Sequence, residues 1–130
     1  MKPKILIVTA RYYKYFSKNL EFYAGGVLNN KAKYKFVSVP GVFEIPAVIS
    51  KNIKKYDAFI ALGCVIKGKT PHFDFISHAT TQAIMSLSIE HKKPIGNGII
   101  TSLNKNQAFS RSKKKGQEAA KAVLSVLNNF

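Results

Sequence analysis

Short apolar runs alternate along this chain with longer segments in which apolar residues recur every three or four positions. The run at 4–10 precedes helical spacing at about 15–28, and the run at 34–39 precedes helical spacing at about 43–55. Short apolar runs are typical of buried strands, whereas three-and-four spacing is typical of amphipathic helices. The first half of the chain therefore predicts two strands, each followed by a helix.

The second half of the chain repeats this order. An apolar run at 58–62 precedes a long helical pattern at about 72–91, and a run at 94–101 precedes helical patterns that start near 105 and 115. Strands that alternate with helices favour a parallel sheet covered on both faces. We therefore expect a single α/β domain over residues 1–130, with four parallel strands between two layers of helices.

The chain is strongly basic, with 21 lysines and arginines, 6 acidic residues and a formal net charge of +15. Such a charge raises nucleic acid as a partner. However, the only arginines are Arg11 and Arg111, although arginine is the residue that binds phosphate and guanine in bidentate fashion. The lysines are also spread over every segment. We therefore do not expect nucleic acid as the main partner, and keep a basic nucleic-acid-binding module as an alternative.

Neither a membrane nor a metal is expected as a partner. No apolar run approaches the roughly 20 residues of a membrane-spanning helix, and the N-terminus enters the first strand without a signal-peptide pattern, so we expect a cytoplasmic protein. The single cysteine, Cys64, cannot form an internal disulfide, and no Cys/His spacing suggests a metal site. We expect a thiol packed in the core.

The segment from Gly63 to Asp74 follows directly on the third apolar run and combines a basic Gly/Thr loop with His72. Ligands bind at the carboxyl ends of strands in parallel sheets, and free backbone N–H groups at a helix start favour anions. An imidazole titrates near neutral pH and can transfer protons. The segment predicts a phosphate site beside a proton-transfer residue, the competing interpretation of His72 being a structural role at a helix start.

The turns after the four strands should meet at one edge of such a sheet. They supply an aromatic ring, Tyr12, a carboxylate, Glu44, the loop before His72 and the segment that begins at Asn97. Tyr12 is equally consistent with an ordinary boundary aromatic, and Glu44 with a helix cap. Since a metal-ligand cluster and a dinucleotide fingerprint are both absent from the sequence, we expect a pocket for a flat polar molecule and a phosphorylated one.

Several of these motifs resemble the 6,7-dimethyl-8-ribityllumazine synthase family over nearly the whole chain. They are Arg11–Tyr12, VPGVFEIP at 39–46, YDA at 56–58, LGCVIKGKTPHFDF at 62–75, GIIT at 98–101, Gln107–Ala108 with Arg111, and KGQEAA at 115–120. The resemblance implies a three-layer α/β/α sandwich of flavodoxin-like topology. It also implies a transferase of riboflavin biosynthesis that condenses 5-amino-6-(D-ribitylamino)uracil with 3,4-dihydroxy-2-butanone 4-phosphate and releases phosphate and water, without a cofactor.

The resemblance assigns roles by position. Tyr12 would stack on the pyrimidine where the family has phenylalanine, Glu44 would bind the ribityl hydroxyls, and His72 would transfer protons. Arg111 of an adjacent subunit would bind the phosphate of the second substrate, together with Lys69 and Thr70. The remaining positions implied to contact the aminouracil or its ribityl chain are Val42, Phe43, Cys64, Val65, Ile66, Asn97 and Lys115.

The resemblance further implies a homo-oligomer, a pentamer or a multiple of pentamers, with active sites at the subunit interfaces. Against this, Asn97 stands where the family usually has an aromatic residue, and Ala79 where it commonly has an acidic one. A catalytically degenerate relative that binds a lumazine or flavin is therefore an alternative. Formation of the lumazine from both substrates would distinguish an active enzyme from such a relative. Steep salt dependence of binding to nucleic acid would indicate the nucleic-acid-binding module.

Overall fold

The computed structural model describes residues 2–68 and 72–129. In this part of the chain one sheet contains four strands: β1 (Lys4–Ala10), β2 (Lys33–Val39), β3 (Ala58–Ile66) and β4 (Ile95–Ser102). The helices are α1 (Lys14–Leu28), α2 (Ile45–Lys51), α3 (His72–His91) and α4 (Lys105–Asn129), with a 3₁₀ turn, η1 (Val42–Glu44), before α2.

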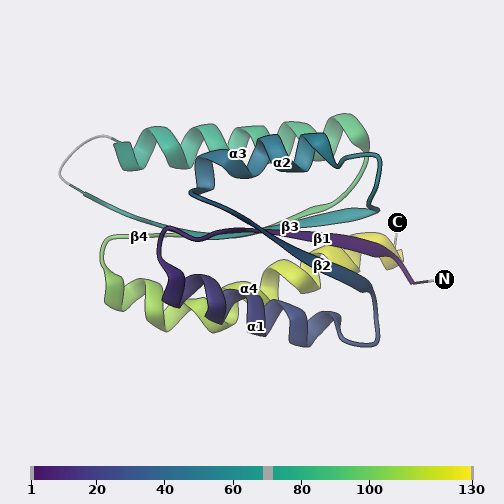
Figure 1. Ribbon diagram of the computed structural model, residues 1–130, viewed down its shortest axis with the longest axis horizontal. Coiled ribbons are helices and arrows are strands. Elements are labelled where there is room, and N and C mark those ends of the chain that lie inside the picture. Colours follow the sequence, from purple (N-terminus) through teal and green to yellow (C-terminus); the bar gives the residue numbers. More distant parts are fainter. Residues whose placement is uncertain (1, 69–71, 130) are drawn as a thin grey trace.

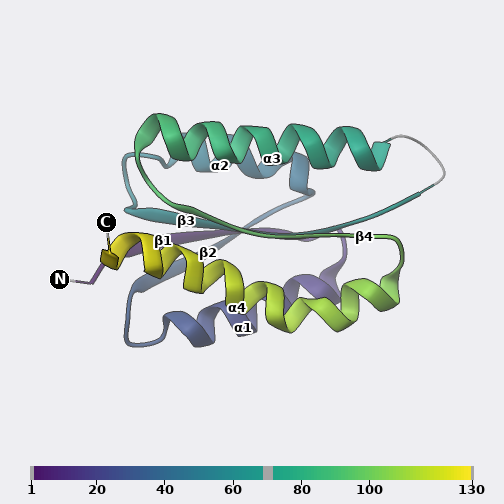
Figure 2. The same ribbon diagram turned by 180° about the vertical axis from the view of Figure 1, so that it is seen from behind.

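All neighbouring strands of the sheet are parallel, in the order β2-β1-β3-β4. The sheet lies between α2 and α3 on one face and α1 and α4 on the other, as Figure 1 and the reverse view in Figure 2 show. The chain thus starts in the middle of the sheet, winds to one edge and then returns to the other, which is flavodoxin-like topology. The expected three-layer α/β/α sandwich is confirmed.

The core consists of two apolar clusters separated by the sheet. Ile7 and Ile60 point toward α1 and α4, whereas their neighbours Val8 and Phe59 point toward α2 and α3, and all four side chains are fully buried. Because successive side chains of a strand alternate between faces that are both covered, the strands appear in the sequence as continuous apolar runs. This double burial explains the predictions of β1 and β3, whereas the edge strand β2 alternates polar and apolar residues and is mostly exposed.

The C-terminal helix differs from its prediction, because one continuous α4 replaces the two helices expected from 105 and 115. Gly116, next to the expected start of the second helix, is buried where α4 crosses α1. A Cβ atom at this position would lie 2.8 Å from the carbonyl oxygen of Leu20. The glycine therefore serves close helix packing, and the helix runs through it.

Helix α3 also departs from expectation. Its apolar stripe was expected to face the core, but only Thr80 and Ile84 are buried, whereas Phe75 and Ile89 are 68% and 69% exposed. Neither α3 nor any other helix within the described residues is long and apolar enough to cross a membrane. A large part of the apolar surface of α3 is thus uncovered in the single chain.

Candidate active site

The turn after β1 carries two adjacent tyrosines. Tyr12 is 75% exposed and meets Tyr13 edge-on, with ring centroids 4.8 Å apart. The preceding residue anchors this turn, because the backbone N–H of Arg11 donates to the carbonyl of Val39 at 2.9 Å and its guanidinium lies 3.9 Å from the carboxylate of Glu21. The accessible ring of Tyr12 therefore projects from a fixed backbone.

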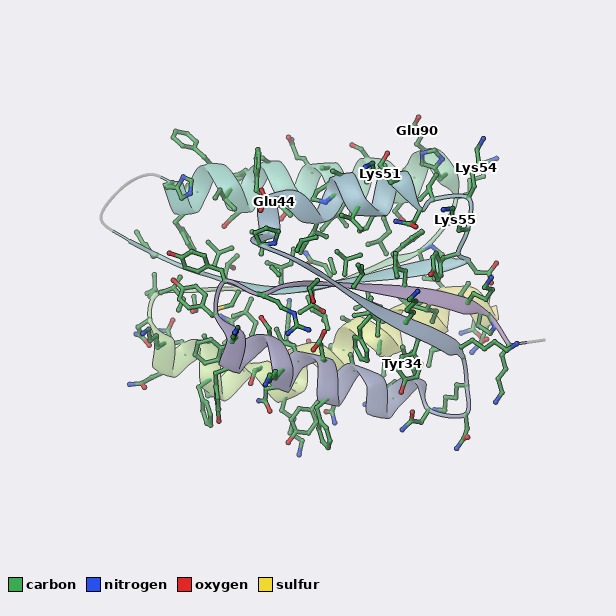
Figure 3. All side chains as sticks on the ribbon, viewed as in Figure 1. Tyr34, Glu44, Lys51, Lys54, Lys55 and Glu90 are labelled. Atoms are coloured by element: carbon green, nitrogen blue, oxygen red, sulfur yellow. The ribbon has the colours of Figure 1, made fainter. Side chains whose placement is uncertain are left out.

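Glu44 closes the connection from β2 to α2. The backbone N–H of Gly41 donates to Oε1 of Glu44 at 2.9 Å, and the N–H of Glu44 donates to the carbonyl of Gly41 at 3.2 Å. The helix-cap interpretation of Glu44 is thereby confirmed, although this bond uses one carboxylate oxygen of the two. Figure 3 shows Glu44 at the start of α2, on the side of the molecule where α3 begins.

Strand β3 continues to Ile66, four residues past the predicted end at Leu62. The side chain of Cys64 packs in the cluster beneath α1 and α4, and Val65 packs on the opposite face. Burial raises the pKa of the Cys64 thiol to about 11, against a smaller lowering by the positive charge of Arg111. The thiol is therefore neutral at physiological pH, and this strand end offers a ligand its backbone groups.

Helix α3 begins at His72, so this imidazole lies at the positive end of a 20-residue helix. Lys69 and Thr70, the predicted phosphate-binding residues, lie outside the described residues. Gly68 is the last described residue of β3's outgoing loop, and it lines the same cavity as His72. The described part of the chain thus brings the histidine and the start of the predicted phosphate loop to one place.

Two adjoining cavities lie at this edge of the sheet, with volumes of about 280 and 550 Å³. Tyr12, Gly41, Val42, His72 and Ile76 line both of them. The smaller cavity is closed by the end of β3 and the larger one by η1 and α3. Together they have the size and the mainly apolar lining of small-molecule sites, with His72 at their junction.

Eight of the predicted site residues line these cavities: Tyr12, Val42, Phe43, Glu44, Cys64, Val65, Ile66 and His72. Sequence reasoning missed Tyr13, which also lines the smaller cavity. The pKa of the Tyr13 phenol is raised by burial and by the neighbouring Tyr12 and Cys64, so its hydroxyl is a proton donor at neutral pH. In the sequence, the position of Tyr13 in the turn after β1, next to Tyr12, could have indicated that it belongs to the site.

Three predicted residues lie elsewhere. Asn97, on β4, accepts a hydrogen bond at Oδ1 from the backbone of Ile99 at 3.0 Å. Arg111, on α4, donates from Nη1 to the carbonyl of Thr101 at 3.0 Å, and Lys115 follows one turn later on the same side of α4. None of the described cavity-lining residues comes from β4 or α4. In a single chain these three predicted residues therefore lie outside the lining of the two cavities.

The described residues contain no group of three or more His, Cys, Asp or Glu side chains that could hold a metal ion. The chemistry available at the two cavities is therefore that of an imidazole, a phenol, a carboxylate and backbone amides. Such groups can position polar molecules and transfer protons between them.

Comparison with known proteins identifies close relatives along the whole chain. The sequence profile of 6,7-dimethyl-8-ribityllumazine synthase matches residues 2–130. A protein of that name from Bartonella tribocorum is 41% identical over 134 residues, covering 97% of this chain and 89% of the relative. Its namesake from Agrobacterium fabrum is 41% identical over 138 residues, covering 97% and 93%. The one from Bartonella henselae is 42% identical over 135 residues, covering 97% and 87%.

Proposed function

The chain belongs to the 6,7-dimethyl-8-ribityllumazine synthase family and is a transferase of riboflavin biosynthesis. It condenses 5-amino-6-(D-ribitylamino)uracil with 3,4-dihydroxy-2-butanone 4-phosphate, releasing phosphate and water. We propose that the two adjoining cavities form one half of its active site, and that a neighbouring copy of the chain supplies the other half. The observation that carries this proposal is the placement of His72 at the junction of two cavities sized for two small molecules.

In this proposal the smaller cavity holds the aminouracil ring. The ring of Tyr12 stacks on the pyrimidine, and the backbone of Cys64, Val65 and Ile66 binds its polar edge. The ribityl chain extends into the larger cavity, where Phe43 and Glu44 form the wall. Because one oxygen of Glu44 holds the N–H of Gly41, the other oxygen is the one assigned to a ribityl hydroxyl.

The phosphate of the second substrate is assigned to the loop before α3, with Lys69 and Thr70, and to Arg111 of the neighbour. A helix N-terminus and an arginine both stabilise the charge of a departing phosphate. Imine formation and ring closure require proton transfers, which we assign to His72. Holding two substrates in contact supplies much of the acceleration of such a condensation, so a strong nucleophile is not required.

The division of the site between two groups of elements supports a head-to-tail assembly. The cavities are built from the ends of β1 and β3 and the turn after β2, whereas Asn97, Arg111 and Lys115 belong to α4 and to β4, the edge strand that pairs with β3. A contact between two different surfaces of the subunit continues around a closed ring when its rotation allows. We propose that the ring is a pentamer, alone or as the unit of a larger assembly.

The activity is tested by mixing both substrates with the purified protein and recording the fluorescence of the lumazine product. Release of phosphate in equal amount should accompany it. A folded, oligomeric protein that yields no product would refute the enzymatic function and favour a lumazine-binding relative instead.

The shared site is tested by complementation between two variants. His72→Ala damages the cavity half and Arg111→Ala the opposite half, so each alone should be impaired. After the two are mixed, dissociated and reassembled in equal amounts, roughly a quarter of the sites in a ring combine an intact His72 with a neighbour's intact Arg111. Activity should rise toward that fraction of the wild-type value. If both residues act within one subunit, mixing restores nothing.

A further inference from the structure

Tyr13, the neighbour of Tyr12, brings a second phenol to the smaller cavity. It directly precedes α1, whose first turn lies at the same end of the molecule as the outgoing end of β3 (Figure 1). Tyr13 lines the cavity of about 280 Å³ together with Cys64 and Ile66, and it is not among the described residues that line the larger cavity. It therefore belongs to the part of the site assigned to the aminouracil ring.

Hydrogen bonds to Ser17 fix the backbone of Tyr13. The carbonyl oxygen of Tyr13 accepts from the backbone N–H and from Oγ of Ser17, each at 3.1 Å. Oγ of Ser17 also donates to the carbonyl of Ala10, the last residue of β1, and the Ser17 side chain is buried. The first turn of α1 thus ties Tyr13 to the end of the strand.

Aromatic contacts hold the ring of Tyr13. It meets the ring of Tyr12 at a centroid distance of 4.8 Å and an angle of 76°, and that of the buried Phe16 at 6.2 Å and 61°. It also packs against the apolar cluster beneath α1 and α4. Edge-to-face pairs of this kind are favourable beyond the area they bury. Tyr13 is therefore fixed between the core and Tyr12, whose own ring stays 75% exposed and open to stacking.

The hydroxyl of Tyr13 contributes nothing to this packing. Within the described residues it forms no hydrogen bond to the protein. A phenylalanine would keep both ring contacts, whereas the hydroxyl of a half-buried tyrosine usually has a hydrogen-bond partner. Burial and the neighbouring Tyr12 and Cys64 raise the pKa of the phenol, so the hydroxyl keeps its proton and can donate.

Few side chains at the smaller cavity can donate a strong hydrogen bond. Among the described lining residues these are Tyr12, Tyr13 and His72, besides the weakly donating thiol of Cys64. His72 is assigned to proton transfer and Tyr12 to stacking through the face of its ring. Tyr13 is therefore the side-chain donor available to the edge of the pyrimidine.

We propose that the hydroxyl of Tyr13 donates a hydrogen bond to a carbonyl oxygen of the aminouracil ring and thereby selects a pyrimidine with an acceptor at that edge. This inference rests on the function proposed above, in which the smaller cavity holds this ring. The phenol acts beside the backbone groups at the end of β3. A ligand without the carbonyl leaves the hydroxyl unpaired, and an unpaired buried donor lowers affinity.

The variant Tyr13→Phe removes the hydroxyl and keeps the ring. Loss of one neutral hydrogen bond should weaken aminouracil binding, measured by calorimetry on the assembled protein, about two- to tenfold. The KM for the aminouracil should rise by the same factor, while the KM for the butanone phosphate and the Tm stay unchanged. Unchanged aminouracil affinity, or a loss confined to the butanone phosphate, would overturn the proposal.

Tyr15→Phe is the matched control. The ring of Tyr15 contacts the same Phe16, at 5.7 Å, but Tyr15 is not among the described residues that line either cavity. Removing its hydroxyl should leave aminouracil affinity unchanged. Equal losses in Tyr13→Phe and Tyr15→Phe would mean that the hydroxyl of Tyr13 has no specific role.

A cycle between protein and ligand identifies the bonded atom. The 2-thio and 4-thio analogues of the aminouracil each replace one carbonyl oxygen by sulfur, a weaker acceptor. Tyr13→Phe should lose its effect on affinity with one of these analogues and keep it with the other. The same loss with the parent compound and both analogues would show that the hydroxyl does not bind a carbonyl oxygen.

Calorimetry needs no turnover, which separates this inference from the condensation. A wild-type protein that binds the aminouracil but forms no lumazine would refute the condensation alone. An active wild type whose aminouracil affinity is unaltered by Tyr13→Phe would refute the hydrogen bond alone. A wild type that does not bind the aminouracil would refute both.

Discussion

Gly96 of β4 offers a sharp test of how tightly α4 is fixed on the sheet. A Cβ atom at this position would lie 2.4 Å from the carbonyl oxygen of Ala119 and 2.9 Å from Cγ2 of Val123. Both partners belong to α4, and the closer one is backbone, which no rotamer change can remove. Gly96→Ala should therefore displace the helix or strain the strand.

The size of the effect follows from this geometry. Inserting a methyl group into a packed core costs about 1–3 kcal/mol, and a backbone clash at this distance belongs at the upper end, about 3 kcal/mol. Replacing a strand glycine by alanine recovers about 0.5–1 kcal/mol through the unfolded chain. The net loss is about 2 kcal/mol, which lowers the Tm of a domain of this size by about 8 °C.

The assay is thermal and urea unfolding at one fixed protein concentration, because the Tm of an oligomer depends on concentration. Gly26→Ala is the matched control: it makes the same chemical change on α1 where the added methyl group meets no atom within 4 Å. It should stabilise the protein by about 0.5–1 kcal/mol. If Gly96→Ala unfolds at or above the temperature of the parent, the close packing of β4 on α4 is incorrect.

The other predictions concern the site. His72→Ala should lower kcat by about 10² to 10⁴ while aminouracil binding, measured by calorimetry, stays within a few-fold; unchanged kcat would remove His72 from proton transfer. Arg111→Ala should raise the KM for the butanone phosphate about tenfold or more through loss of a charged hydrogen bond, and an unaltered KM would contradict the phosphate assignment. Burial raises the pKa of Cys64 from its ordinary 9.0 to about 11, so its contribution to stability should be complete below pH 9 and disappear as the pH rises through 11. Cys64→Ala should flatten urea stability across that window; the same slope in both proteins would contradict the shift.

Periodicity predicted the elements because the central strands β1 and β3 are buried on both faces, whereas the edge strand β2 alternates and is mostly exposed. Periodicity failed where the outcome depends on which other segment covers the apolar face of a helix. The stripe of α3 is apolar, yet Phe75 and Ile89 are 68% and 69% exposed in the single chain. At Gly116 a residue type that commonly ends a helix is instead required by the approach of Leu20, a contact between helices distant in sequence.

The site shows the same limit. Tyr12, Glu44 and His72 could be placed together from the sequence because each follows a strand of one parallel sheet, and the carboxyl ends of such strands share an edge. The capping and binding roles of Glu44 could not be separated, since both need a carboxylate at a helix start. The position of Arg111 depends on how far α4 extends and on which part of the sheet it covers. Local sequence patterns encode neither of these.

The exposed apolar residues of α3 and the position of Arg111 outside the cavities both support the proposed ring. An isolated chain leaves Phe75, Met85 and Ile89 exposed, and Arg111 does not line either cavity beside His72. In the proposed ring, the β4 edge of one copy beside the β2 edge of the next would complete the cavities, and ring closure would bring the helical layers that contain α3 toward one another and bury apolar side chains. In such a ring, both the stability and the activity of the protein would depend on the same contact between subunits. Any change that weakens this contact should therefore reduce both stability and activity.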